Sequence, residues 1–304
     1  SSENENDLVS AYFSSVNYLK KYQTADFNNK KDLERVKNLI LESDIVLTNF
    51  KPGDAEKFEL SYDNFKENQK LIYASITGFG NDDNRAAFDV VLQAEAGYMF
   101  MNGEEKSNPV KIPVALMDVL AAHQLKEAIL IALMKRQIEN KGSFIEVNLY
   151  QSAICSLSNQ ASNYLMENFI PKRMGSAHPN ICPYGDIITF KQNKNLVLAI
   201  GSDKQFIQLC DLLNVSELYN NPMFSSNLMR VKNRASLINK LNQICNALEL
   251  ETYLPLFHKN KIPCGEIKNL EEVFKDPKAN ELIREEIIEG KITKRVSSIA
   301  FKIN

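Results

Sequence analysis

The chain has 304 residues, of which 44% are hydrophobic, and a formal net charge of −2. This length predicts two domains, or one large domain with an insertion. The charge lacks the basic excess of a nucleic-acid-binding protein, and no apolar run approaches the roughly 18 residues of a membrane span, so we expect neither partner. The five cysteines show no CxxC pair. They indicate free thiols in a reducing compartment, hence a cytoplasmic protein without a metal site.

Two helix–strand units are predicted in the first third of the chain. In order, the elements are a helix at 32–43, a strand at 44–49, a helix at 62–68 and a strand at 71–76. The loops after the strands, Lys51–Gly53 and Thr77–Gly80, contain glycine. In α/β sheets ligands bind at the carboxyl ends of the strands, so these loops are candidates for a binding edge. No GxGxxG or GxxxxGK[ST] occurs, which leaves a Rossmann dinucleotide fingerprint and a P-loop unsupported.

The middle of the chain places Asp118 between an apolar run and a helical pattern. Leu120, Leu125 and Ile129 recur on one face of that predicted helix. An aspartate at this junction can cap the helix, or it can act as a nucleophile; in both cases the helix dipole favours its ionised form. The neighbouring elements are a helix at 88–100, a strand at 144–148 and a helix at 151–166.

A segment rich in proline and glycine, residues 171–185, marks a predicted domain junction. The elements predicted after it are a hairpin of strands 187–190 and 196–200, helices at 204–213, 234–247 and 251–260, a strand with a turn at 262–267, a short helix at 269–275 and a strand within 291–303.

In this order, the segments resemble those of the class III (CaiB/BaiF) CoA-transferase family. The resemblance rests on SAYFSSVN (10–17), SDIVLTNFKPG (43–53), LIYASITGFG (71–80), FDVVLQAEAG (88–97), PVALMD (113–118), NQASNYL (159–165), MGSAHPNICPYG (174–185), IGSDKQFIQLC (200–210) and IPCGEIKNLEEVFKDP (262–277). These pieces span most of the chain. NQASNYL and GSAHPNICPYG look most like the branch that uses succinyl-CoA and small dicarboxylic acids.

The resemblance implies an α/β fold with a Rossmann-like large domain and a smaller α+β domain. The large CoA-binding domain is expected at 1–184, the small domain at 185–275, and a segment that returns to the large domain at 276–304. The family forms homodimers in which two chains interlock. The family's first strand and helix, and its usual C-terminal helix, have no counterpart in this sequence.

The resemblance also implies an activity, the transfer of CoA from an acyl-CoA donor, expected to be succinyl-CoA, to a carboxylic acid. The CoA thioester is then a substrate, and no permanently bound cofactor is expected. Asp118 matches the aspartate that becomes acylated, a role open to carboxylates. The expected CoA contacts are Asn49, Phe50, Lys57, Arg85, Lys20 and Lys21. The expected substrate contacts are Gly78, His178 and Arg173, the last by pairing with a distal carboxylate.

Other readings stay open on the sequence alone. His178 could equally be a residue that anchors its loop. Arg173 could be a solvated surface residue. The function could instead be that of a carnitine-type transferase or a racemase, but Phe88 stands where the family's racemases carry a histidine. A catalytically idle CoA-binding protein is the remaining alternative, because Asn28 replaces a lysine that the family often has.

Overall fold

A computed structural model describes residues 10–288 and 290–303. Its contacts divide the chain into two compact units. Ala25–Ser176 forms one, here called the parallel-sheet unit, and the remaining described residues form the antiparallel-sheet unit. These boundaries differ from those expected at 184/185 and 275/276, and that three-part division stays a prediction. Within the described residues, no helix combines the length and apolar character needed to cross a membrane.

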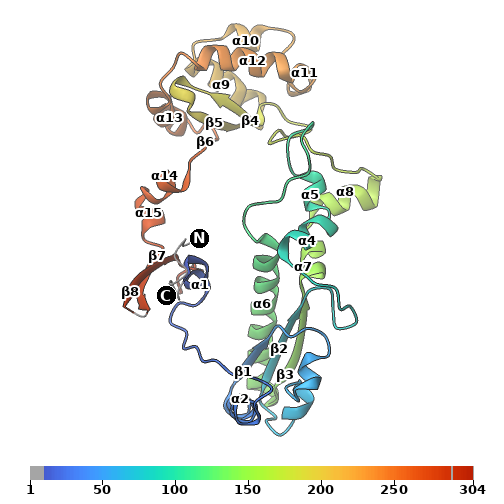
Figure 1. Cartoon of the computed structure of the whole chain (residues 1–304). Coiled ribbons are helices and arrows are strands. Elements are labelled where there is room, and N and C mark those ends of the chain that lie inside the picture. Colours follow the sequence, from blue (N-terminus) through green and yellow to red (C-terminus); the bar gives the residue numbers. More distant parts are fainter. Residues whose placement is uncertain (1–9, 289, 304) are drawn as a thin grey trace. The chain divides into compact units, whose positions relative to one another are not determined.

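The parallel-sheet unit is built on three strands, β1 (Ile45–Thr48), β2 (Ile72–Thr77) and β3 (Ser143–Asn148), paired in parallel in the order β1-β2-β3 (Figure 1). All three strands were predicted from the sequence. Parallel neighbours need a crossover connection. The one between β1 and β2 holds α3 (Asp54–Lys57) and the 3₁₀ helix η1 (Tyr62–Phe65).

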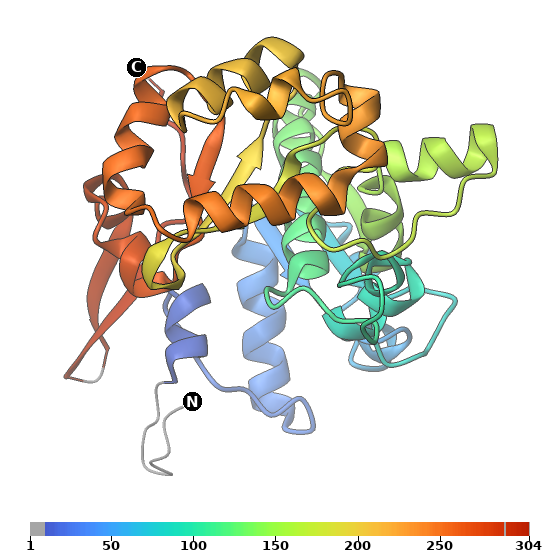
Figure 2. The ribbon, with the colours of Figure 1, turned by 90° about the horizontal axis from the view of Figure 1, so that it is seen from above.

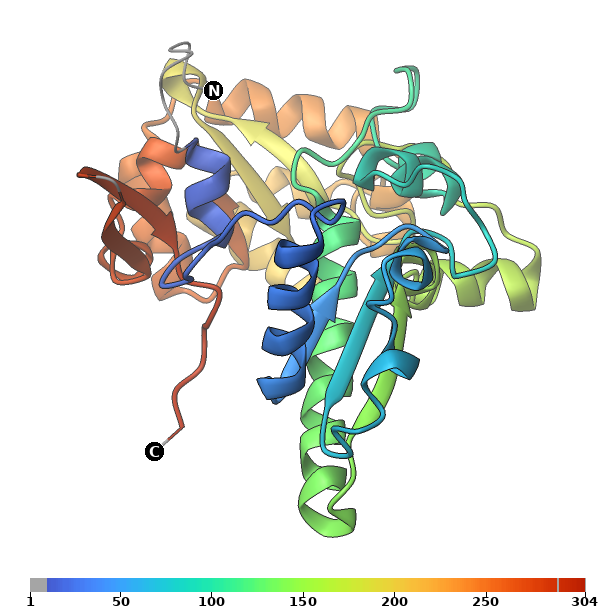
Figure 3. The same ribbon diagram turned by 60° about the horizontal axis from the view of Figure 1, so that its bottom comes forward.

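Helices pack on this sheet through alternating strand residues. Tyr73 lies in an apolar cluster with Ile40 of α2 (Lys30–Glu42) and with Phe65. Ile72 and Ala74 are also buried and point to the opposite face, because successive side chains alternate in a strand. The long helix α6 (Leu116–Glu139) contacts β2 and β3 (Figure 3). It connects β2 to β3, and its first turn therefore lies toward the carboxyl ends of the strands.

Two helices predicted as continuous are each broken in two. The pattern at 88–100 forms α4 (Asp89–Glu95) and α5 (Tyr98–Met101), and the pattern at 151–166 forms α7 (Leu149–Cys155) and α8 (Asn159–Glu167). At the breaks, Gly97 has φ 85° and Ser158 has φ 50°. A left-handed residue cannot continue a right-handed helix, so the apolar periodicity alone was a misleading guide here.

The antiparallel-sheet unit contains β4 (Tyr184–Thr189), β5 (Asn195–Ala199) and β6 (Cys264–Glu266), in the order β4-β5-β6. The predicted hairpin is confirmed, with the short 3₁₀ turn η2 (Lys191–Asn193) between its strands. The helices that follow in this unit (Figure 2) are α9 (Asp203–Leu212), α10 (Glu217–Asn220), α11 (Asn227–Lys232), α12 (Arg234–Cys245) and α13 (Leu250–Lys259). They share one apolar core with the sheet. The sequence reading missed α10 and α11.

The rest of this unit is a small assembly of distant segments. Its elements are α1 (Ala11–Val16), α14 (Leu270–Phe274), α15 (Pro277–Asn280) and the hairpin of β7 (Ile283–Ile288) and β8 (Lys291–Val296). The Arg295 guanidinium donates to the Ser15 carbonyl at 3.4 Å, and the Leu19 N–H donates to Glu286 Oε2 at 3.0 Å. Strand β7 was not predicted.

Gly142, in the turn before β3, gives a test of the close packing in the parallel-sheet unit. A Cβ at this position would lie 2.0 Å from the Leu71 carbonyl oxygen, which is backbone and cannot rotate away. We expect Gly142→Ala to lower the free energy of unfolding by about 1–3 kcal/mol, the usual cost of overpacking. Gly265→Ala is the matched control, because its Cβ would meet nothing nearer than Val197 Cγ1 at 3.8 Å. Equal urea-unfolding midpoints for the two variants would contradict this.

Candidate active site

A cavity of about 470 Å³ lies in the parallel-sheet unit, where β1 and β2 end. Loops after these strands supply much of its wall, as expected for the carboxyl edge of a parallel sheet. The lining residues are Asn49, Phe50, Lys51, Pro52, Ile76, Thr77, Gly78, Asp83, Asn84, Arg85, Ala86, Ala87, Phe88, Asp118 and Leu149. The structure thus brings five of the predicted site residues together: Asn49, Phe50, Gly78, Arg85 and Asp118.

Asp118 is the third residue of α6 and is exposed toward solvent. The expectation that it caps this helix is wrong. The cap position is Ala115, which has no side chain able to accept a helix N–H. The carboxylate of Asp118 is therefore not used as a cap and lines the cavity instead.

The first turn of α6 is stabilised by a carboxylate from another helix. Asp89, the first residue of α4, accepts the Met117 N–H on its Oδ1 at 2.8 Å. This bond satisfies one of the four N–H groups that every helix start leaves without an intrahelical partner.

Asp89 also changes the acidity of Asp118. Although Asp118 is exposed, the surrounding protein removes part of the hydration of its carboxyl group; this desolvation, followed by the charge of Asp89, raises the pKa of Asp118 above its usual value. The helix dipole favours the ionised form and therefore acts in the opposite direction. The raised pKa could not be predicted from the sequence, because the second carboxylate next to α6 comes from α4.

Arg85 is on the cavity wall but is already paired. Its guanidinium lies 2.9 Å from a carboxylate oxygen of Asp83 and 2.9 Å from one of Glu95, and 3.8 Å from the centre of the Phe79 ring. The side chain is half exposed, so these pairs are screened by water. A phosphate at this position would share the cation with two carboxylates.

Two predicted contacts in the same unit do not line the cavity. Lys57 is exposed at the end of α3, with its ammonium 5.0 Å from the centre of the Phe58 ring. Arg173 donates to the Phe100 carbonyl at 2.9 Å. Neither the nucleotide-contact role of Lys57 nor the carboxylate-pairing role of Arg173 is tested by these positions, and both stay predictions.

Three predicted residues belong to the antiparallel-sheet unit. Lys20 and Lys21 are exposed in the segment after α1. His178 is half buried: its Nδ1 accepts the Asn180 N–H at 3.1 Å, and its ring meets Tyr184 edge-on at 5.3 Å between centres. These contacts are those of a loop anchor, and the substrate role of His178 stays a prediction.

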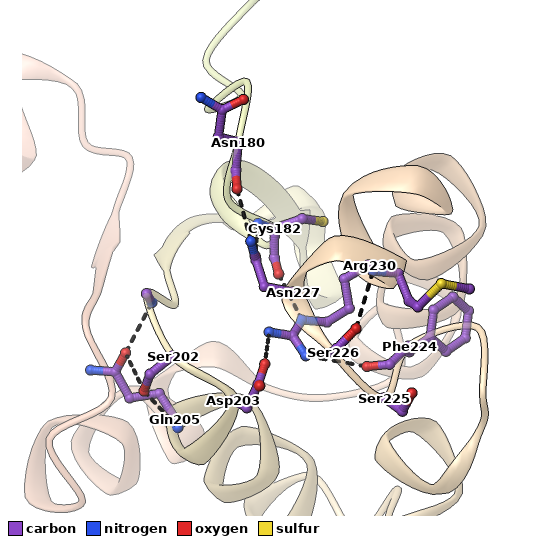
Figure 4. A network of polar contacts seen from close by, with 12 residues as sticks. Asn180, Cys182, Ser202, Asp203, Gln205, Phe224, Ser225, Ser226, Asn227 and Arg230 are labelled. Atoms are coloured by element: carbon purple, nitrogen blue, oxygen red, sulfur yellow. Dashed lines mark hydrogen bonds and ion pairs between the residues drawn. The ribbon is translucent and has the colours of Figure 1, made fainter.

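The loop that carries His178 is held by side chains of α11 and α12. Arg234 donates to the carbonyls of His178 at 2.5 Å and Ile181 at 2.7 Å. Asn227 accepts the Cys182 N–H at 3.1 Å and donates to the Asn180 carbonyl at 2.8 Å (Figure 4). Side chains of the two helices thus bind four backbone groups of this loop, the N–H of Cys182 and the carbonyls of His178, Asn180 and Ile181.

A buried arginine completes this network. Arg230, 1% exposed, donates to the carbonyls of Cys182 at 2.8 Å and Phe224 at 3.2 Å, and to Asp203 Oδ1 at 2.6 Å (Figure 4). Its guanidinium carbon also lies 4.5 Å from the centre of the Phe206 ring. These contacts give Arg230 a structural role that the sequence did not suggest.

The buried cysteines make poor alternative nucleophiles. Burial raises the pKa of Cys182, Cys210 and Cys245 to about 12 each. The thiolate is the reactive form, so these thiols stay inert at neutral pH. Among the residues that the structure describes, no group of three or more His, Cys, Asp and Glu side chains is placed to hold a metal ion.

Several cavity residues were not predicted as site residues. Phe88 is 69% exposed on the cavity wall, and Lys51, Asp83 and Asn84 also line it. Lys51 directly follows Asn49-Phe50, and Phe88 precedes the aspartate that contacts α6. The sequence did hold a signal for these residues, since they adjoin residues that were predicted for the site. Phe88 was used only as evidence against a racemase.

The fold is α/β, and its cavity lies at the carboxyl edge of a parallel sheet with an aspartate at a helix start on its wall. The profile of CoA-transferase family III matches residues 2–295. The chain belongs to this family.

Named relatives agree with this assignment. The chain is 33% identical to an acyl-CoA transferase of Fusarium pseudograminearum over 88% of its own length and 59% of that protein. It is 33% identical to the human succinyl-CoA:glutarate CoA-transferase over 88% of its length and 62% of that protein. A CaiB/BaiF family protein from Brucella suis has a similar structure, with a TM-score of 0.86 and 35% identity over 96% of this chain and 78% of that one. The chain thus spans about three fifths of these two curated relatives.

Proposed function

We propose that the protein transfers CoA from an acyl-CoA donor, with succinyl-CoA as the expected donor, to a carboxylic acid, through a covalent intermediate on Asp118. The observation that carries this proposal is the position of Asp118, which lines one cavity with Asn49 and Phe50 at the start of α6. Family membership supports the reaction class. The relatives named succinyl-CoA:glutarate and succinyl-CoA:mesaconate CoA-transferases support a dicarboxylate acceptor.

The reaction proceeds by exchange of acyl groups. The Asp118 carboxylate attacks the thioester carbonyl, which forms a mixed anhydride and releases the CoA thiolate. The thiolate attacks the aspartyl carbonyl, which forms an aspartyl-CoA thioester and releases the donor acid. The acceptor carboxylate attacks this thioester and again releases the thiolate. Attack of the thiolate on the acceptor carbonyl gives the new acyl-CoA and restores the Asp118 carboxylate.

Each step passes through a tetrahedral oxyanion, which hydrogen-bond donors on the cavity wall would stabilise. Gly78, an expected substrate contact, lies on the wall with Asp118, and we propose backbone N–H groups of its loop, Thr77–Gly80, as such donors. Asn49, Phe50 and Arg85 are proposed to contact CoA. Water must be kept from the anhydride, because hydrolysis would end the transfer. No permanently bound cofactor is needed for this chemistry.

We also propose that the protein is a homodimer with a Rossmann-like large domain. Exposed apolar residues on one part of the parallel-sheet unit support the dimer: Leu165 is 77% and Met166 82% exposed on α8. A second cavity, of about 350 Å³, lies beside them and is lined almost wholly by apolar side chains. Contiguous apolar surface of this kind marks interaction sites. The five unpaired cysteines support a reducing compartment such as the cytoplasm.

Mass spectrometry tests the proposed function directly. The protein is incubated with succinyl-CoA and quenched with hydroxylamine, then digested. A mass change on the peptide that holds Asp118, together with transfer of CoA to glutarate, is expected. An unmodified Asp118 in a protein that still binds CoA would favour an idle CoA-binding homologue or another donor.

The pH dependence of transfer gives a separate prediction. The ionised form of Asp118 reacts, so the rate falls as pH drops through the raised pKa of this carboxyl. Asp89→Asn removes the charge that contributes to the raised pKa, and the amide oxygen can still accept the Met117 N–H. Its NH2 group then faces Gln93 Nε2 and loses that bond, so the position of the acid limb, and not the size of the rate, is the readout. We therefore expect the acid limb of the kcat/KM profile, which reports the pKa values of the free enzyme, to move to lower pH.

The control for this experiment is Glu139→Gln, which removes a carboxylate at the far end of α6. Its acid limb should coincide with that of the wild type. An acid limb of Asp89→Asn that stays in place, or that moves to higher pH, would contradict the role given to Asp89.

A further inference from the structure

Gln93, on α4, is a fully buried polar side chain, 0% exposed. A buried amide is costly unless its donors and acceptor are satisfied. Its Oε1 accepts the Ile112 N–H at 2.7 Å, and its Nε2 donates to Asp89 Oδ2 at 2.6 Å and to the Ile112 carbonyl at 3.3 Å. One side chain thus binds both backbone groups of Ile112 and one oxygen of Asp89.

These bonds converge on the start of α6. The second oxygen of Asp89 accepts the N–H of Met117, which is buried and directly precedes Asp118. Ile112 lies on the segment that leads into the same helix. Gln93 therefore holds the entry segment at Ile112 directly, and the first turn of α6 through Asp89. It is not among the residues that line the cavity.

We propose that Gln93 is a positioning residue for Asp118, fixing the first turn of α6 through Asp89 and Ile112; this rests on the proposed transferase function. Attack on a thioester requires reacting atoms about 3–3.5 Å apart, and a displacement of about 1 Å can cost on the order of 10²-fold in rate. Asp118 directly follows Met117, whose N–H is bound by Asp89, so the contacts of Asp89 and Gln93 contribute to the position of the Asp118 backbone.

The test compares steady-state kinetics of two substitutions. Gln93→Met has a similar length and makes none of the amide's bonds. We expect its kcat to fall by about 10–100-fold, while KM for the acyl-CoA stays within about threefold because Asn49 and Phe50 are untouched. Gln93→Glu keeps an acceptor for the Ile112 N–H but has no donor for Asp89 when ionised. It should lose kcat as well.

Phe65→Leu is the matched control, because Phe65 is buried in the apolar cluster with Ile40 and Tyr73, which includes neither Gln93 nor Asp89. It should lower stability and leave kcat per folded molecule unchanged. The kcat values are compared on equal amounts of folded protein. If the Gln93 variants have the same kcat as Phe65→Leu, this inference is overturned and the proposed function is left intact. A wild-type protein without transfer activity would overturn the proposed function and this inference with it.

Discussion

The Asp118→Asn variant should transfer CoA at least about a thousandfold more slowly than the wild type, since loss of a covalent nucleophile removes the reaction path itself. The amide has nearly the shape of the carboxylate, so the cavity formed by Asn49, Phe50 and Arg85 should still bind CoA. The measurement is kcat with succinyl-CoA and a dicarboxylic acid, together with a CoA dissociation constant. A variant that keeps more than a tenth of the wild-type kcat would exclude Asp118 as the nucleophile.

The stability of the same variant provides an independent check. The pKa of Asp118 is raised in the folded protein, by desolvation and by the charge of Asp89. A carboxyl with a raised folded pKa favours the fold most when it is protonated, and this contribution is lost as pH rises through that pKa. At neutral pH the neutral amide should therefore leave the unfolding midpoint unchanged or raise it. A large drop would point to a structural role.

The Arg230→Met variant should lower the free energy of unfolding by about 3 kcal/mol or more. The guanidinium is buried and binds the carbonyls of Cys182 and Phe224 as well as Asp203. Methionine fills similar space but leaves both carbonyls without this donor, and each unsatisfied buried group costs about 1–3 kcal/mol. Urea unfolding followed by circular dichroism measures the change.

Lys135→Ala serves as the control for this variant. Lys135 and Glu139 form an exposed pair on α6, 3.7 Å apart, and such surface pairs contribute about 0–1 kcal/mol. A midpoint for Arg230→Met close to that of Lys135→Ala would show that the network in Figure 4 contributes little to stability.

The sequence was a good guide to the elements that have strong local signals. The strands at 44–49, 71–76 and 144–148 and the hairpin around Gln192 are present. Asn49 and Gly78 lie where strands end, so the rule for the edge of a parallel sheet was sufficient to place them beside a cavity. Asp118 was predicted from its position at a helix start and from the family resemblance; it lines the same cavity, and its catalytic role stays a prediction.

The features that were missed depend on contacts between distant parts of the chain. The breaks at Gly97 and Ser158 interrupt patterns that look continuous in hydrophobicity. The bond from Asp89 to the Met117 N–H joins residues 28 apart in the sequence, and Arg230 binds a carbonyl 48 residues away. Local periodicity holds no information on such pairs. The raised pKa of Asp118 and the role of Gln93 could therefore be inferred only from the structure.

The pairing of Arg85 has a consequence for how long a ligand stays bound. In the proposed CoA contact, a phosphate at this guanidinium shares its positive charge with the carboxylates of Asp83 and Glu95, which already bind it. The attraction to the phosphate is then smaller than it would be for an unpaired arginine. This loss of affinity appears chiefly as a faster dissociation of the ligand. For the proposed CoA transfer this weaker attraction is an advantage, because very tight binding of the nucleotide would make release of the product the slow step.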